Sequence, residues 1–377
     1  MRSRAALVAA AAAAGTLLAA AAPASALSVL VESPVGGEEP ATVEVADDAA
    51  EANAVTISVV GDKLVVRDTA ALQVRALVGC DQQGGLGSDT VACPLPGKVR
   101  INLLERDDSV DIGAGVPAPT VFGGAGNDTI TGAIRAYGQA GDDTLTGTGG
   151  ADYLDGGLGA DVVRGGDGDD VLREGTGTEP DTLDGGNGSD TLSFSGRSTP
   201  VQADLATGGQ TAGGAGEGNV VSNLERLVGG SGNDTLRVAV PVTGTAPVLI
   251  GKRGNDRLTL AGAARGRVLG GKGDDVLTGG KGADRLEGET GDDRLSGGGG
   301  GDALFGGIGR DRLAGGAGGD RLEPGLGRDT VSGGSGDDRI VARDTQRDVL
   351  DGGSGRDRAT VDSIDRVRAV ERVARRV

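Results

Sequence analysis

Residues 270–341 read GGKGDDVLT, GGKGADRLE, GETGDDRLS, GGGGGDALF, GGIGRDRLA, GGAGGDRLE, PGLGRDTVS and GGSGDDRIV without a break. These eight units follow one pattern, GGxGxDxUx, in which U is a large aliphatic residue. A fixed period sustained over so many units indicates a repeat architecture, in which each unit buries its apolar residue against its neighbours. The fold is therefore derived from the chemistry of a single unit.

Each unit is predicted to form a six-residue turn followed by a three-residue strand, xUx. Side chains alternate along a strand, so only U points inward. The glycines permit positive φ and let the turn curl tightly. Two units then return the chain to its starting side, one strand spacing further on. The predicted aliphatic core consists of Leu277, Leu286, Leu295, Leu304, Leu313, Leu322, Val331 and Ile340.

The aspartate at the sixth position of each unit is predicted to stack over the aspartate two units later, about 4.8 Å away. Two bare carboxylates at such a distance repel by roughly 3 kcal/mol at an effective dielectric near 20. A cation between them relieves this repulsion. Ca²⁺ suits carboxylate and carbonyl oxygens in flexible geometry, whereas Mg²⁺ demands a strict octahedron. In this stretch, one edge would carry Asp275, Asp293, Asp311 and Asp329, and the other Asp284, Asp302, Asp320 and Asp338.

An earlier block of units extends the set of predicted calcium ligands. GQAGDDTLT, GTGGADYLD, GGLGADVVR and GGDGDDVLR run from residue 138 to 173, and GGNGSDTLS follows at residue 185. Their sixth-position aspartates are Asp143, Asp152, Asp161, Asp170 and Asp190. Further ligand candidates lie in isolated units or beside interruptions of the pattern, namely Asp128, Asp181, Asp234, Asp256, Asp348 and Asp357.

Metal binding is expected to be coupled to folding. Burial of two aliphatic residues per coil is too small to offset the conformational entropy lost when eighteen residues are ordered. An arginine follows the aspartate in many units, as at Arg285, Arg294 and Arg312. Their positive charges are expected to soften the repulsion between carboxylates, so that part of the roll could persist without metal.

The composition excludes several functions. The chain of 377 residues has 74 Gly, a formal net charge of −18, no His, no Trp, two Tyr and three Phe. The acidic balance disfavours nucleic acid, which requires clustered cations. The lack of His removes the Ser/His/Asp triad and His-based zinc protease sites. Divalent cations are the expected partners of such a chain.

The amino terminus is predicted to be a cleaved signal peptide, residues 1–26. Arg2 and Arg4 precede an Ala-rich apolar run, and Ala24-Ser25-Ala26 fits a signal-peptidase site. A membrane anchor is the alternative, although the run is short for a span. The exported protein would be extracellular, where Cys80 and Cys93 are expected to pair; two unpaired thiols are the alternative.

Residues 27–100 are predicted to form a small β-rich segment. Val55 to Val60, Gly61-Asp62 and Lys63 to Arg67 are typical of a hairpin with a two-residue turn. The isolated match GGLGSDTVA at residues 84–92 is either chance or a first coil of the roll. The remaining predicted parts are a first roll block (101–193), interrupting linker strands (194–228), a second roll block (229–360) and a carboxy-terminal cap or tail (361–377).

The units resemble the calcium-binding repeat of the RTX, or hemolysin-type, family over residues 123–360. This resemblance implies an all-β fold, a parallel β-roll, with Ca²⁺ held between turns of units two apart by the aspartate carboxylate and loop carbonyls. The interruption RSTPVQADLATGG with GNVVSNLERLVGGSGND is similar to a linker within secreted bacterial members. A protease domain of the HExxH type is impossible without His, and no long apolar pore-forming region is present.

Three functional hypotheses follow. The favoured one is a secreted, non-enzymatic calcium-binding protein, structural or adhesive, whose possible partners include cell-surface or matrix components. The second is a carbohydrate-active enzyme or epimerase accessory module, for which acids such as Asp107 and Asp108 would be candidates; a degenerate roll turn is the favoured explanation of that pair. The third is a disordered acidic spacer. The arginine-rich tail could dock on an acidic surface, but a solvated cap is favoured.

Overall fold

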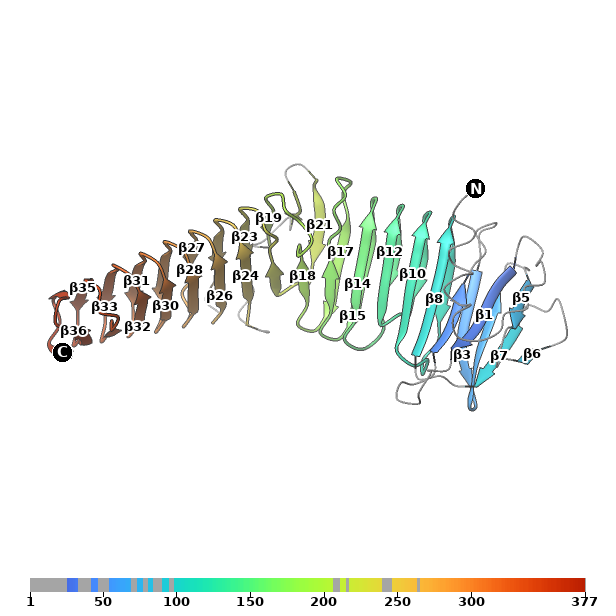
Figure 1. Cartoon of the computed structure of the whole chain (residues 1–377), viewed down its shortest axis with the longest axis horizontal. Helices are drawn as coiled ribbons and strands as arrows, with labels where there is room; N and C mark the ends of the chain where they lie inside the picture. The colour runs from blue at the N-terminus through green and yellow to red at the C-terminus, as the bar shows by residue number, and fades with distance from the viewer. Residues whose placement is uncertain are drawn as a thin grey trace. The chain divides into compact units, whose positions relative to one another are not determined.

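The computed structural model describes residues 26–32, 42–46, 54–68, 73–76, 81–83, 90–94, 98–205, 211–214, 217–238, 246–262 and 265–376. All regular structure in these residues is β, which confirms the predicted all-β class. No helix in this part of the chain is long and apolar enough to cross a membrane. The chain divides into two compact units, residues 1–140 and residues 141–377; the labelled strands of both appear in Figure 1.

The first unit contains two sheets. One has the order β5-β1-β2-β8-β10-β12 and the other β6-β7-β4-β3-β9-β11. The strands are β1 (Ala26–Glu32), β2 (Thr42–Ala46), β3 (Ala54–Val60), β4 (Lys63–Asp68), β5 (Gln73–Ala76), β6 (Asp81–Gln83), β7 (Thr90–Pro94), β8 (Lys98–Glu105), β9 (Ser109–Ile112), β10 (Pro119–Ala125), β11 (Thr129–Thr131) and β12 (Arg135–Ala140).

The predicted hairpin is confirmed, because β3 and β4 pair antiparallel with Val60 opposite Lys63 and with Gly61 at φ 66° in the turn. Strand β7 carries the end of the isolated GGLGSDTVA match and pairs antiparallel with β4. Its strand therefore does not form a coil of the parallel roll. Cys93 is buried in β7. Its predicted partner Cys80 lies outside the described residues, as do residues 1–25 of the predicted signal peptide, so both remain predictions.

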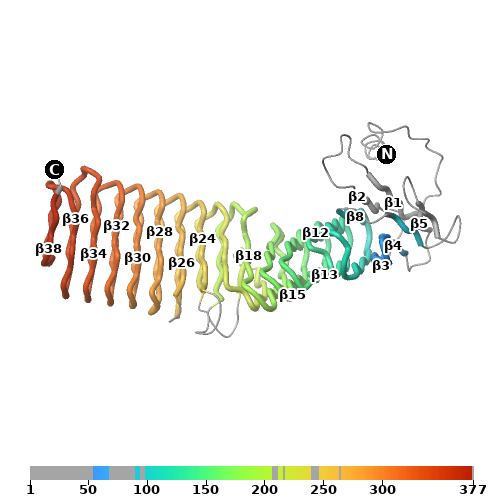
Figure 2. The backbone as a smooth tube through the Cα atoms, turned by 90° about the horizontal axis from the view of Figure 1, so that it is seen from below, coloured from blue at the N-terminus to red at the C-terminus, as the bar shows by residue number. Residues whose placement is uncertain are grey.

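The second unit is a parallel β-solenoid whose coils lie side by side from β18 to β38 (Figure 2). One face, here called sheet A, consists of β14 (Tyr153–Leu158), β16 (Val171–Arg173), β18 (Thr191–Ser193), β22 (Arg226–Val228), β24 (Val248–Arg253), β26 (Arg267–Lys272), β28 (Arg285–Thr290), β30 (Ala303–Ile308), β32 (Arg321–Leu326), β34 (Arg339–Val341), β36 (Arg358–Asp362) and β38 (Arg372–Arg376).

The opposite face, sheet B, consists of β13 (Thr144–Thr146), β15 (Val162–Asp167), β17 (Thr182–Asn187), β19 (Gln202–Asp204), β20 (Thr211–Ala212), β21 (Asn219–Ser222), β23 (Thr235–Val238), β25 (Arg257–Leu260), β27 (Val276–Thr278), β29 (Arg294–Gly299), β31 (Arg312–Ala317), β33 (Thr330–Ser335), β35 (Val349–Ser354) and β37 (Arg366–Arg368).

The predicted return of the chain after two units is confirmed by strand register. Leu286 lies opposite Leu304, which in turn lies opposite Leu322, each step being eighteen residues. All eight predicted core residues are at most 2% exposed. The strands of this block are mostly six residues long instead of the predicted three, because parallel pairing continues through the first residues of the following unit, as between Gly307 and Gly325.

The interruption is part of sheet B. Strands β19, β20 and β21 form a short antiparallel excursion, and β21 then pairs in parallel with β17. On the other face, β18 pairs directly with β22. At the carboxy terminus, β37 and β38 pair in parallel with β35 and β36. The segment predicted to be a cap or tail, residues 361–377, thus adds further strands to both faces.

Candidate metal sites

All nineteen predicted calcium ligands are buried, none being more than 6% exposed. Within the second unit they form two aspartate ladders, one beside each sheet. In both ladders the Oδ1 atom of one aspartate accepts a hydrogen bond from the backbone N–H of the aspartate one coil earlier. For example, Asp293 N donates to Asp311 Oδ1 and Asp311 N donates to Asp329 Oδ1, both at 2.8 Å. The predicted stacking of the aspartates is therefore confirmed.

The sheet B ladder contains Asp143, Asp161 and Asp181 before the interruption, and Asp234, Asp256, Asp275, Asp293, Asp311, Asp329 and Asp348 after it. The sheet A ladder contains Asp152, Asp170 and Asp190, and then Asp284, Asp302, Asp320, Asp338 and Asp357. In the first unit, Asp108 N donates to Asp128 Oδ1 at 2.8 Å.

Four ladder positions escaped the sequence analysis because they do not fit the full nonapeptide. Asn219 accepts from Asp181 N, Glu225 from Asp190 N, Asp365 from Asp348 N and Glu371 from Asp357 N. Each begins a stretch in which an acid or amide is followed, two residues later, by an aliphatic residue, as in Glu225-Arg226-Leu227. A search for this shorter pattern would have found the four additional ladder positions in the sequence.

Asp107 and Asp108 also belong to a roll turn. The stretch LLERDDSVD, residues 103–111, has the register of a unit, with Leu104 at φ 76° and Arg106 at φ 83° in place of glycines. Asp107 Oδ1 accepts from Asn127 N at 2.8 Å, and Asp108 N donates to Asp128 Oδ1, so both residues are hydrogen-bonded to the following turn. The degenerate-turn interpretation of this pair is confirmed.

The other carboxylate oxygen of most ladder aspartates is buried without a hydrogen-bond partner among the described residues. This is true of Oδ2 in Asp170, Asp190, Asp256, Asp275, Asp293, Asp302, Asp311, Asp320, Asp329, Asp338, Asp348 and Asp357. A buried acceptor without a donor is costly. The repetition of the same orphaned atom from coil to coil indicates a site for a ligand that interacts with oxygen.

Glycines leave the space that such a ligand would occupy. A Cβ at Gly288, the first residue of its unit, would collide with Asp293 Oδ2 and with the carbonyl oxygen of Gly306 in the next coil. A Cβ at Gly309 would collide with the carbonyl oxygen of Gly291. Carboxylate and carbonyl oxygens thus converge beside the glycine, and they form the hard-oxygen donor set that Ca²⁺ prefers.

Burial is the main electrostatic feature of the ladders. It raises the pKa of Asp293 to about 8 and that of Asp311 to about 7; the backbone hydrogen bond from the previous coil opposes the rise, and neighbouring aspartates add to it. No arginine is among the causes for either residue. Arg285 instead binds Glu287 at 2.8 Å on the outer face. The expectation that arginines relieve the repulsion between ladder carboxylates therefore stays a prediction.

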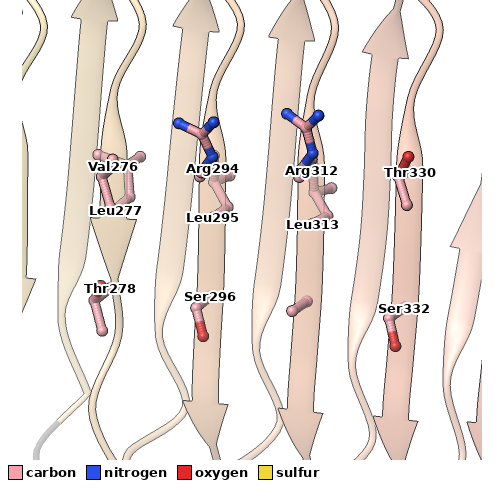
Figure 3. Close-up of a pocket in the computed structure, with 11 residues that line it drawn as sticks. Val276, Leu277, Thr278, Arg294, Leu295, Ser296, Arg312, Leu313, Thr330 and Ser332 are labelled. Atoms are coloured by element: carbon pink, nitrogen blue, oxygen red, sulfur yellow. The ribbon is translucent and has the colours of Figure 1, made fainter.

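The outer faces of the two sheets differ. On sheet A, Arg267 and Arg285 both bind Glu287, and the guanidinium of Arg285 lies 4.2 Å from the ring centroid of Phe305. On sheet B, Arg294 and Arg312 lie on adjacent strands above a hollow of about 270 Å³ (Figure 3). Hydroxyl side chains line its other side, and neither arginine has an ion pair with a described residue.

No group of three or more His, Cys, Asp or Glu side chains able to hold a metal is present among the described residues. A solenoid with aspartate ladders, orphaned oxygens and glycine-lined spaces defines the class of calcium-binding β-rolls.

Comparison with known families agrees with this class. The model of the RTX calcium-binding nonapeptide repeat matches residues 120–133, 137–172, 176–196 and 225–237, and overlapping segments between 260 and 359. The chain belongs to this family of repeat proteins. No curated protein matches the chain.

Proposed function

We propose that this protein is a secreted, non-enzymatic calcium-binding β-roll whose folding is coupled to Ca²⁺, with a structural or adhesive role outside the cell. The observation that carries the proposal is the row of buried, unpartnered Oδ2 atoms in the aspartate ladders. Their ligand would be Ca²⁺, held by these carboxylates and by neighbouring carbonyl oxygens. Bound Ca²⁺ supplies positive charge where the chain stacks negative charge.

Calcium titration of the purified chain, followed by circular dichroism, tests this proposal. The chain in chelator should gain β signal as Ca²⁺ rises to about 10⁻⁴ to 10⁻³ M, the range of extracellular calcium modules, while Mg²⁺ at equal concentration should have much less effect. Asp292 and Asp293 offer a matched pair, because the side chain of Asp292 is 41% exposed and Asp293 is buried. Asp293→Asn should shift the midpoint upward and Asp292→Asn should not. A β signal independent of calcium would contradict the proposal.

The predicted signal peptide supports export, and mass spectrometry of the protein recovered from a secreting host would test it. A mature chain that begins after Ala26 is the expected result. Recovery of the uncleaved chain inside the cell would contradict this part of the proposal.

The sheet B face supports an adhesive role. Arg294 and Arg312 present two guanidinium groups next to hydroxyl side chains, an arrangement suited to carboxylate or sulfate groups. The calcium-loaded protein should be retained on a sulfated-polysaccharide column, and Arg294→Ala with Arg312→Ala should elute at lower salt. Arg285→Ala is the matched control, because Arg285 already binds Glu287. Equal elution of both variants would argue against this face as the adhesive surface.

A further inference from the structure

The turns of the second unit have two conformations. In most of them the second residue of the nonapeptide has positive φ, as at Glu289 (76°), Gly298 (104°) and Gly307 (115°). The turns that end in Asp152, Asp234 and Asp284 differ, because their second residues lie outside this region of backbone conformation. We call these three the closed turns, and we call those whose second residue has positive φ the open turns; the lengthened turns before Asp181 and Asp348 belong to neither group.

A closed turn satisfies its own carboxylate. Gly280 N donates to Asp284 Oδ2 at 2.6 Å, and Gly230 N donates to Asp234 Oδ2 at 2.7 Å. In the third closed turn, the N–H of Thr148 donates to Asp152 Oδ2 at 2.5 Å, and its hydroxyl lies 3.1 Å from the same atom. The oxygen that is orphaned in the open turns of Asp293 and Asp302 therefore has a donor in each closed turn.

The closed turns share a position in the ladders, since each comes first in its run of aspartates. The Oδ1 atom of Asp284 accepts from Gly266 N, and that of Asp234 accepts from Val201 N, so that neither follows an aspartate. For Asp152 the residue eighteen positions earlier is Ile134. Residues 199–201 and 261–266, which precede two of these turns, contain no aspartate.

This correlation has a physical reason. Ca²⁺ needs six to eight oxygen ligands, more than one short turn can supply, so a site requires two stacked repeat turns. The first turn of a run has a repeat turn on one side only. Its carboxylate then gains more from a hydrogen bond within the turn than from an incomplete metal site.

We infer that the three runs of aspartates that start at Asp152, Asp234 and Asp284 each begin with a turn that contributes no carboxylate to a calcium ion, because these three aspartates cap their own turns. The first carboxylate ligands are Asp170, Asp256 and Asp302, one coil later. This inference rests on the proposed calcium binding and revises the ligand set predicted from the sequence. It makes the number of ions depend on pairs of adjacent repeat turns instead of on the number of aspartates.

The test compares Asp284→Asn with Asp302→Asn, which change successive members of one ladder that are both 2% exposed. Bound calcium per chain is measured by equilibrium dialysis and elemental analysis of the full-length protein. Asp284→Asn should retain the calcium content of the unmodified chain, and Asp302→Asn should lose at least one ion. Equal losses from both variants would overturn the inference.

A second pair keeps the test decisive if either variant fails to fold. Asp234→Asn and Asp256→Asn stand in the same relation in the sheet B ladder, and the same difference in calcium content is expected. If the unmodified chain binds no calcium, the proposed function fails. If it binds calcium and both variants of a pair lose equally, only the assignment of the closed turns fails.

Discussion

The interruption and the regular block of residues 270–341 both bury carboxylate groups, and they differ in where the compensating positive charge comes from. In the interruption, Arg197 is 6% exposed and lies between two buried acids; it binds Glu217 at 2.6 Å and forms a bidentate pair with Glu174. In the regular block the carboxylates stack on each other. The charge that the interruption obtains from a side chain must come from solution in the regular block.

The surroundings of Arg197 make it a complete substitute for a metal at this point. Its guanidinium also donates to the carbonyl oxygens of Gly175 and Gly177. Asn219 donates to Glu174 and occupies the ladder position after Asp181 with a neutral amide. Burial raises the pKa of Glu174, and the hydrogen bonds and positive charge of Arg197 oppose that rise. The comparison shows that a cation of the chain itself, Arg197, lies beside the buried acids of the interruption, whereas no such side chain among the described residues lies beside the stacked aspartates of the regular block.

The largest expected effect concerns pH in the absence of calcium. Burial raises the pKa of Asp293 to about 8, of Asp256 to about 7 and of Asp302 to about 6. Because these folded-state values lie above the unfolded value, their contribution favours the metal-free fold below about pH 4 and is lost as pH rises through 6 to 8. The chain in chelator should therefore show β signal near pH 4.5 and lose most of it by pH 8.

Circular dichroism across this range measures the effect, and Asp293→Asn with Asp311→Asn should flatten the profile. Protons and Ca²⁺ compete for the same oxygens, so calcium affinity should rise over the same interval. A β signal that stays constant from pH 4.5 to 8 in chelator would mean that ionisation of the stacked carboxylates does not destabilise the metal-free fold.

A smaller, local effect is expected at the interruption. Arg197→Met leaves Glu174 and Glu217 buried without their cation, and loss of one partner of a buried pair costs about 3 to 5 kcal/mol. In saturating calcium, thermal unfolding should begin at a lower temperature, and proteolysis should first cleave between residues 197 and 222. Arg197→Met combined with Glu174→Leu should recover part of the loss. Unchanged cleavage in the single variant would show that the guanidinium is dispensable.

The smallest effect is expected for ion pairs on the turn surface. Arg310 binds Asp292 at 2.8 Å, and both side chains are exposed, at 65% and 41%. Arg310→Ala should leave both the free energy of unfolding and the calcium affinity almost unaltered, because exposed ion pairs contribute little to stability. A loss of stability as large as that of Arg197→Met would show that a solvent-exposed arginine stabilises the fold as much as a buried one.

The regular part of the fold could be predicted because one side chain per unit determines it. The core residues repeat at the coil length of eighteen residues, as at Leu286, Leu304 and Leu322. The aspartates follow the same period, so strand register and aspartate stacking can both be predicted from residue spacing. The interruption could not be predicted in this way, since Arg197, Glu174 and Asn219 are far apart in sequence and share no period. Their association depends on the path of β19 to β21, which no local pattern specifies.

The members of the aspartate ladders were predicted more completely than the backbone conformation of the turns that carry them. The Oδ1 contacts follow from period alone, whereas the closed conformation at Gly280 and Gly230 depends on what the preceding coil lacks. Leu104 and Arg106 show the converse, because non-glycine residues occupy positive φ where the pattern requires glycine. Motif searching misses such a turn even though its aspartate remains in register.

The direction of the Oδ1 hydrogen bonds means that each coil depends on the coil that is synthesised after it. Each aspartate N–H is satisfied only by the coil that follows it in sequence, and the series ends at Asp365 and Glu371. A chain that emerges with its amino terminus first, from a ribosome or a translocation pore, therefore always has an incomplete leading edge. Each coil is completed as soon as the next coil is in place, so only the most recently emerged coil has ladder N–H groups without their acceptors.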